Sequence, residues 1–304
     1  MSEFVPYGAL SDEQREMVDS EDYLERYNAA QQGYGLEKLV NDRSDYVRIA
    51  VAEQGYGLDQ LVDDEDWHVR VVVAKQGYGL ERLITDVEVD VRVAVAEQGY
   101  GLDALVNDPD WEVRETVAEQ GYGLDKLMHD PDVFVREAVA QQGYGLNQLV
   151  EDQDWPVRAA VARQGHGFDV LVNDSERWVR AVVAEYGYGL DQLVNDSNAV
   201  VRSAVAQQGY GLDVLVNDPF WGVRVAVAEQ GYGLDVLVND PEEWVRGVVA
   251  EQGYGLDVLV DDIDRGVCET VSSCLRDNDY KSIEEWIAAN PDKCALSENR
   301  FRAR

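Results

Sequence analysis

The sequence repeats itself every 22 residues over most of its length. The tripeptide Gly-Tyr-Gly, with His166 replacing tyrosine in one copy, begins at positions 33, 55, 77, 99, 121, 143, 165, 187, 209, 231 and 253. An arginine recurs with the same step at positions 48, 70, 92, 114, 136, 158, 180, 202, 224 and 246, each preceded by an aspartate six residues earlier. A fixed period of this length is typical of a solenoid, in which each repeat packs only on its neighbours.

One repeat, DPDWEVRETVAEQGYGLDKLMHD, predicts a helix at its start. Asp108 is a suitable N-cap and Pro109 suits the first helical position, so we expect the helix to run from there to about Gln120. Val113 and Val117 fall on one face at helical spacing and are expected in the core. By contrast, the proline after Trp155 is expected to delay the start of the helix in its repeat.

The second half of the repeat predicts a sharp turn and a short helix. Gly121 fits a left-handed C-cap, and Gly123 permits a second turn. A helix near Leu124 to His129 follows, and it is short enough to be either α or 3₁₀. The alternating L-x-L of a leucine-rich repeat with a β-strand is absent, so we expect β content close to zero.

The pattern D-x-x-x-x-V-R-x-x-V-A, as in Asp64…Val69-Arg70…Val73-Ala74, resembles the HEAT repeat and especially the leucine-rich repeat variant family. The resemblance covers roughly residues 20–266. It implies an all-α fold, a right-handed α-solenoid of about eleven helix-turn-helix repeats with terminal caps. Because these families are mostly binding scaffolds, it also implies binding rather than catalysis.

Both ends of the chain depart from the repeat. We expect an N-terminal cap over residues 1–19, a repeat solenoid over 20–266, and a cap helix with a basic tail over 267–304. Cys268 takes the arginine position of its repeat, and residues 279–290 predict an amphipathic closing helix. The basic residues of the tail are Arg300, Arg302 and Arg304.

The chain is strongly acidic, with 60 acidic and 26 basic residues and a formal net charge of −34. Such a charge repels nucleic acids and anionic lipid surfaces and attracts basic proteins. It also suits a salt-rich cytoplasm, where acidity serves solubility alone. The chain starts without a basic segment followed by an apolar run, and no stretch approaches 18 apolar residues, so a cytoplasmic location is expected, with no membrane partner.

Residues for catalysis or metal binding form no recognisable motif. The histidines are scattered over different repeat positions, and the cysteines lack zinc spacing: His68, His129, His166, Cys268, Cys274 and Cys294. Asp-x-Asp steps such as Asp64/Asp66 lack the remaining ligands of a calcium loop. We therefore expect no enzymatic activity, no cofactor and no specific metal site.

The regular polar and aromatic positions each allow two interpretations. The arginines could form a track for phosphates, but the matched aspartates favour a ladder of ion pairs. The tyrosines could form a stacking row, although packing of each turn against the next is favoured.

Aromatic residues near the start of the longer helix are the strongest candidates for partner binding. They lie two or three residues before the arginine: Trp67, Trp111, Phe134, Trp155, Trp178, Trp221 and Trp244. Acidic residues accompany them: Asp66, Asp110, Glu112, Asp132, Asp154 and Glu176. This position varies between repeats, as a specificity-determining surface would. The alternative is that the rings only cover the groove between repeats.

Two functions fit these features. The first is a protein-interaction scaffold whose acidic, aromatic surface docks a basic partner. The second is a nucleic-acid mimic that inhibits a DNA- or RNA-binding protein such as a defence nuclease. Helix layers lie roughly 8–10 Å apart, so eleven repeats span on the order of 100 Å and carry about one net charge per 3 Å. Duplex DNA carries one per ~1.7 Å, so mimicry requires the acids to gather on one face.

Overall fold

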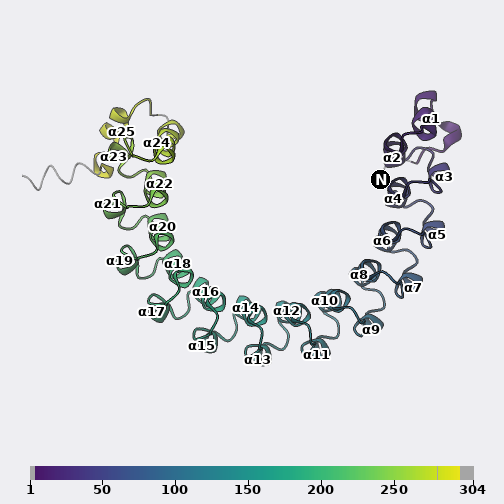
Figure 1. Cartoon of the computed structure of the whole chain (residues 1–304), viewed down its shortest axis with the longest axis horizontal. Helices are drawn as coiled ribbons and strands as arrows, with labels where there is room; N and C mark the ends of the chain where they lie inside the picture. Colours follow the sequence, from purple (N-terminus) through teal and green to yellow (C-terminus); the bar gives the residue numbers. More distant parts are fainter. Residues whose placement is uncertain (1–3, 279, 295–304) are drawn as a thin grey trace, which may run out of the picture. The chain divides into compact units, whose positions relative to one another are not determined.

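The computed structural model describes residues 4–278 and 280–294, which form an all-helical solenoid with 25 α-helices (Figure 1). Within these residues β pairing is limited to an isolated parallel bridge between Val5 and Tyr34. Long helices begin every 22 residues from Tyr23 to Arg265, so the sequence period is also the structural period. The all-α prediction is confirmed.

By its internal contacts the chain divides into two compact units, Met1–Gly145 and Leu146–Arg304. The first unit begins with the 3₁₀ turn η1 (Tyr7–Ala9) and α1 (Asp12–Asp19). Its long helices are α2 (Tyr23–Gln31), α4 (Asp45–Glu53), α6 (Trp67–Lys75), α8 (Val89–Glu97), α10 (Trp111–Glu119) and α12 (Val133–Gln141). Its short helices are α3 (Leu36–Leu39), α5 (Leu58–Leu61), α7 (Leu80–Leu83), α9 (Leu102–Leu105) and α11 (Leu124–Leu127).

The second unit continues the same alternation. Its short helices are α13 (Leu146–Leu149), α15 (Phe168–Leu171), α17 (Leu190–Leu193), α19 (Leu212–Leu215), α21 (Leu234–Leu237) and α23 (Leu256–Leu259). Its long helices are α14 (Trp155–Arg163), α16 (Arg177–Glu185), α18 (Ala199–Gln207), α20 (Trp221–Glu229), α22 (Glu243–Glu251) and α24 (Arg265–Asp277). The unit ends with α25 (Ile283–Ala289) and η2 (Pro291–Lys293). Within each unit the long helices pack in one row and the short helices lie in a second row (Figure 1).

The core lies between these two rows. Val113 and Val117 of α10 are fully buried, and Leu127 of α11 covers them from the short-helix row. Small residues such as Ala118, also fully buried, let successive long helices approach closely. Gln120 is the exposed C-cap residue and not a core residue, in contrast to the expectation that it shares the valine face.

The long helices begin two residues later than Asp108 and Pro109 predict. Helix α10 starts at Trp111, and the side chain of Asp110 accepts a hydrogen bond from the amide of Glu112 at 3.0 Å. The carboxylate of Asp108 is engaged by an arginine of the preceding repeat and is not free to cap. The expected delay at Trp155 is also wrong: α14 starts there in register, because a proline in the first turn needs no amide donor.

The two glycines of each turn adopt the left-handed conformation that the sequence predicts. Gly121 has φ of 73° and Gly123 has φ of 63°. The short helices that follow, such as α11, are α-helical, which settles the choice left open between α and 3₁₀. The tyrosine rings of these turns are only partly buried, and Tyr122 is 42% exposed.

The C-terminal end closes the array with altered chemistry. The Cys268 thiol donates to the carbonyl of Asp262 at 3.2 Å, a position that an arginine occupies in other repeats. Helix α25 begins after its N-cap Ser282 and is shorter than predicted. Residue 279 and the tail arginines Arg300, Arg302 and Arg304 lie outside the described residues. None of the helices in residues 4–278 and 280–294 is both long and apolar enough to traverse a bilayer.

Candidate partner-binding surface

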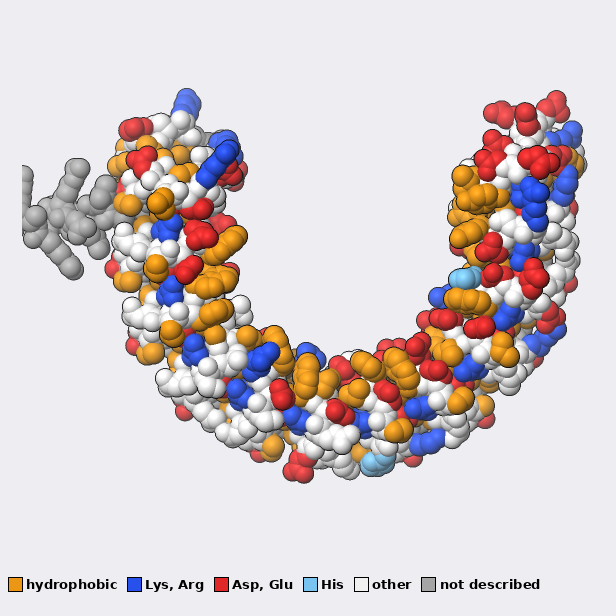
Figure 2. All heavy atoms as spheres, in the orientation of Figure 1, with side chains coloured by type: hydrophobic (Ala, Val, Ile, Leu, Met, Phe, Trp, Pro, Cys, Tyr) orange, Lys and Arg blue, Asp and Glu red, His pale blue; other side chains and the backbone are white. Residues whose placement is uncertain are grey.

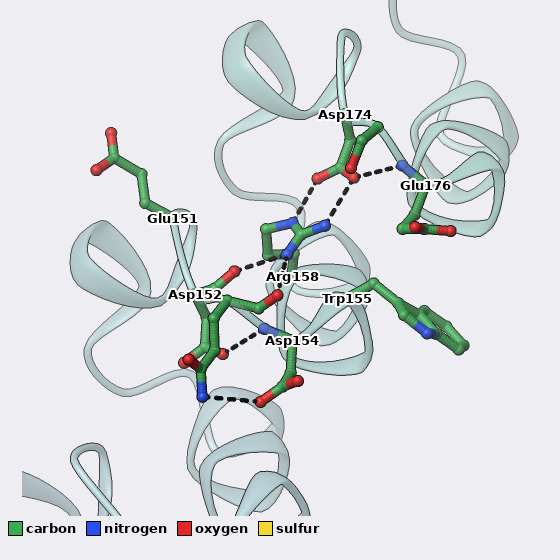
Figure 3. A pocket seen from close by; sticks show the side chains of 9 residues that line it. Glu151, Asp152, Asp154, Trp155, Arg158, Asp174 and Glu176 are labelled. Carbon is green, nitrogen blue, oxygen red and sulfur yellow. Dashed lines mark hydrogen bonds and ion pairs between the residues drawn. The ribbon is translucent and has the colours of Figure 1, made fainter.

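Each ladder arginine joins two consecutive repeats. Arg158 donates from Nε and Nη2 to the carboxylate of Asp174 in the next repeat, at 2.5 and 2.9 Å. Its Nη1 donates to the backbone carbonyl of Asp152 in its own repeat at 2.6 Å (Figure 3). The carboxylate of Asp174 also accepts the amide of Glu176 at 2.8 Å. All five guanidinium or carboxylate directions are thus used inside the protein, which supports the ion-pair interpretation over a phosphate track.

The same arrangement recurs along both units. The arginine–aspartate pairs are Arg26–Asp42, Arg48–Asp64, Arg70–Asp86, Arg92–Asp108, Arg114–Asp130, Arg158–Asp174, Arg180–Asp196, Arg202–Asp218, Arg224–Asp240 and Arg246–Asp262. Burial alone would raise the pKa of Asp130, but the Arg114 side chain and the Asp132 amide hydrogen-bond its anion, and the pKa lies below its usual value. The ladder is therefore charged and satisfied in the folded state.

A shallow depression of about 350 Å³ lies over one rung of this ladder (Figure 3). Glu151, Asp154, Trp155 and Glu176 line it, together with the paired Arg158. Trp155 points away from Arg158 in this view. Because the charged groups at its base are already paired, the depression offers a polar surface and no activated nucleophile or base.

The Asp-x-Asp steps use their carboxylates internally. The first aspartate of each step belongs to the ladder, as Asp108 and Asp130 do. The second caps a long helix: Asp66 accepts the His68 amide at 2.9 Å, and Asp132 accepts the Phe134 amide at 2.9 Å. These steps therefore do not form the row of free acids that nucleic-acid mimicry requires.

Among the other acidic candidates, Asp110 caps α10, while Asp154 accepts the side-chain amide of Gln153 at 3.3 Å. Glu112 and Glu176 are exposed at the starts of α10 and α16. The six acids thus lie in one zone of the repeat, at the N-terminal ends of the long helices. Two of them, Glu112 and Glu176, have fully exposed side chains for a partner.

The candidate aromatic residues lie at the N-terminal ends of the long helices and are partly exposed. Trp67, Trp111, Trp155 and Trp221 are the first residues of their helices, and Phe134, Trp178 and Trp244 are the second. Trp244 is 63% exposed, Trp178 43% and Trp155 39%, which is too much for rings that only fill a groove. Figure 2 shows hydrophobic side chains gathered along the long-helix side of each unit.

These aromatic residues occur in pairs that the sequence analysis missed. Trp111 and Phe134, 23 residues apart, have ring centroids 5.0 Å apart across two repeats. Tyr23 and Tyr46 have the same separation in sequence and lie 6.0 Å apart. A first-position ring in one repeat thus faces a second-position ring in the next. The same two positions are occupied by Trp155 with Trp178, and by Trp221 with Trp244. The 23-residue spacing, one more than the repeat, was the available signal.

Trp67 lacks such a partner, since the matching position is Asp90. It stacks instead on His68 of its own helix, with ring centroids 3.6 Å apart. The His68 ring nitrogen Nδ1 lies 2.9 Å from the carboxylate of Asp66. This part of the surface therefore differs in chemistry from the paired positions.

The electrostatics of the surface favour cations. Burial, followed by the charges of Glu119, Asp132, Glu137 and Glu112, raises the pKa of Glu115, one helical turn after Trp111. In the second unit the Arg177 guanidinium lies over the Trp178 ring, 4.9 Å from its centroid. That contact is a cation–π interaction made by the protein itself on one of the candidate rings.

Comparison with known proteins adds no relative. Neither the protein-family models nor the curated proteins contain a match to this chain. The helical array with its sequential contacts identifies a helical repeat protein, and any function must be argued from its surfaces. Within residues 4–278 and 280–294, no group of histidine, cysteine or carboxylate side chains is placed to hold a metal ion.

Proposed function

We propose that this protein is a non-catalytic scaffold that binds a basic protein through the aromatic pairs at the N-terminal ends of its long helices. The exposure of Trp155, Trp178, Trp221 and Trp244 carries the proposal, because exposed tryptophans on an ordered scaffold are the usual anchors of protein interfaces. The exposed carboxylates of Glu112 and Glu176 supply the complementary charge.

Arginine is the side chain that such pairs suit best. A planar guanidinium stacks on an indole ring and forms two hydrogen bonds to a carboxylate, whereas a lysine ammonium does neither equally well. The contact of Arg177 with Trp178 is an internal example of the stacking. We therefore propose an arginine-bearing partner in preference to a merely basic one.

The finer family assignment, to the leucine-rich repeat variant or HEAT-like solenoids, is likewise proposed. It rests on the D-x-x-x-x-V-R-x-x-V-A pattern and on the stacked helix pairs. A cytoplasmic partner is proposed with it. Nucleic-acid mimicry is the less favoured alternative, because the regular aspartates are spent in the ladder and in helix caps.

The test compares two synthetic peptides, nona-arginine and nona-lysine, by isothermal titration at several salt concentrations. We expect nona-arginine to bind more tightly, and Trp178→Ala with Trp244→Ala to weaken it about tenfold or more, as loss of an interface anchor does. Val200→Ala is the matched control, since Val200 occupies the same helical position without a ring. Equal affinity for both peptides, or no effect of the tryptophan changes, would contradict the proposal.

A second experiment separates scaffold from mimic. Partners captured from a lysate are challenged with duplex DNA while the chain is immobilised. A mimic's partner should be released by DNA at moderate salt, because both compete for one site. Retention of the partner with DNA, and its loss with the tryptophan variant, is the outcome expected of a scaffold.

A further inference from the structure

The N-terminal segment pairs its backbone with the first Gly-Tyr-Gly turn. The amide of Val5 donates to the carbonyl of Gly33 at 2.9 Å, and the amide of Gly35 donates to the carbonyl of Val5 at 3.0 Å. One residue thus satisfies the carbonyl of the first glycine and the amide of the second. Its neighbour Phe4 stacks on the tyrosine of the next turn, Tyr56, with ring centroids 5.1 Å apart.

The C-terminal segment occupies the last Gly-Tyr-Gly turn in a related way. The amide of Gly255, the second glycine of that turn, donates to the carbonyl of Lys293 at 2.8 Å. Leu256, which follows the turn, is fully buried, and Cys294 is 5% exposed. Gly35 and Gly255 hold the same place in the repeat, so both ends of the chain use the same backbone donor.

The internal turns present the same groups without an occupant. Within residues 4–278 and 280–294, the second-glycine amides make no hydrogen bond at Gly79, Gly101, Gly123, Gly189, Gly211 and Gly233. The same holds for the first-glycine carbonyls at Gly77, Gly99, Gly121, Gly187, Gly209 and Gly231.

These turns are also accessible. Gly99 and Gly121 are exposed, and a methyl group added to either would meet no atom within 4 Å. Tyr100 is 41% exposed and Tyr122 42%. By contrast, Gly35 is buried where the N-terminal segment covers it. What buries the terminal turns is therefore the added segment and not the turn itself.

We propose that the internal Gly-Tyr-Gly turns bind an extended segment of a partner protein, in which an aromatic residue precedes a β-branched aliphatic residue. The aliphatic residue would pair its amide and carbonyl with one turn, as Val5 does, and the aromatic residue would stack on the tyrosine of the adjacent turn, as Phe4 does. This mode resembles strand addition, in which main-chain bonds supply affinity and side chains supply specificity.

This turn surface is distinct from the aromatic pairs. The pairs begin the long helices, and the turns follow their C-terminal ends, so the two surfaces lie at opposite ends of each nine-residue helix. Either proposal can fail without the other. A scaffold with both surfaces would hold two different partner segments at once.

The test uses the intact chain labelled with ¹⁵N-glycine and a synthetic peptide of the sequence SEFVPYGAL, which matches residues 2–10. We expect peptide-induced shifts at the amides of Gly79, Gly101 and Gly123. A peptide N-methylated at the valine lacks the donor to the glycine carbonyl and should bind about tenfold more weakly. Methylation at the glutamate, which precedes the pairing residues, is the matched control.

Substitution of the protein gives a second readout. Tyr100→Ala with Tyr122→Ala should abolish the shifts at these two turns and leave those at Gly211 and Gly233 unchanged, since the rings are largely exposed and the fold is retained. Shifts confined to Gly33 and Gly35 would mean only exchange with the chain's own N-terminal segment and would overturn the proposal. An absence of shifts, or equal binding of both methylated peptides, would overturn it too.

Discussion

Arg114 holds the carboxylate of Asp130 across the boundary between two repeats, with Nε to Oδ2 at 2.7 Å and Nη2 to Oδ1 at 2.9 Å. Its Nη1 donates to the backbone carbonyl of Asp108 at 2.8 Å. The two side chains are 13% and 6% exposed. One arginine therefore closes the loop of its own repeat and fixes the loop of the next, so that the ladder couples neighbouring repeats.

Arg114→Ala should destabilise the first unit by about 3 kcal/mol, because it leaves a buried carboxylate without its partner. Urea unfolding followed by circular dichroism measures the loss, and hydrogen exchange locates it to the repeats on either side. Asp130 is the group left stranded. Unchanged unfolding would show that the pair is solvated and contributes little.

The matched double variant separates the pair from its parts. Arg114→Met combined with Asp130→Asn removes both charges, so the combined loss should be smaller than the sum of the single losses. Simple additivity would mean that each side chain acts through other contacts.

Acid should unfold the array through the ladder aspartates. Hydrogen bonds from Arg246, which outweigh burial, lower the pKa of Asp262, and the pKa of Asp130 is lowered as well. A lowered folded pKa contributes stability that is complete above the unfolded value of about 3.9 and is lost as pH falls through the folded value. Denaturation from pH 7 to 2 should show this loss below about pH 4. The difference between the native chain and Arg114→Ala should shrink over the same range.

Glu115 should behave with the opposite sign. Burial and the carboxylates around it raise its pKa, so its ionised form opposes folding, and stability gains as pH falls through the raised value. Glu115→Gln should stabilise the chain at neutral pH by about 0.3–0.5 kcal/mol, the usual size for removing an i,i+4 like-charge contact such as that with Glu119. The gain should vanish near pH 4. Exposed Glu112→Gln serves as the control.

The 22-residue period predicts the fold well because every repeat makes the same local choices. Valine and alanine spacing places the long helices, and paired glycines place the turns. The ladder is harder to predict. An aspartate six residues before one arginine is also sixteen residues after the previous arginine, so Asp108 could pair with Arg114 or with Arg92. In the structure its carboxylate binds Arg92, and only its carbonyl binds Arg114.

Other features depend on contacts between repeats that no single repeat contains. The N-cap falls on Asp110 because Arg92 already holds Asp108, which requires the packed neighbour. The pairing of Trp111 with Phe134 becomes visible only when the helices stack. The docking of Val5 on the first turn depends on the chain end folding back, which periodicity does not describe.

The two glycines of one turn provide a matched pair for the last prediction. Both have positive φ, so alanine at either costs about 1–2 kcal/mol in backbone strain. At Gly121 a methyl group meets nothing within 4 Å, whereas at Gly123 it lies 2.5 Å from Cγ2 of Val106 in the preceding repeat. Gly123→Ala should therefore lose about 1–3 kcal/mol more than Gly121→Ala, the range for overpacking.

Urea unfolding of both variants, each alone and with Val106→Ala, measures the difference. Shortening Val106 removes the clashing methyl, so the excess cost of Gly123→Ala should fall in that background while the cost of Gly121→Ala stays the same. Equal losses for the two glycine variants would show that the second glycine serves backbone geometry alone. A larger loss that Val106→Ala relieves would show that its missing side chain is what lets each short helix pack on the repeat before it.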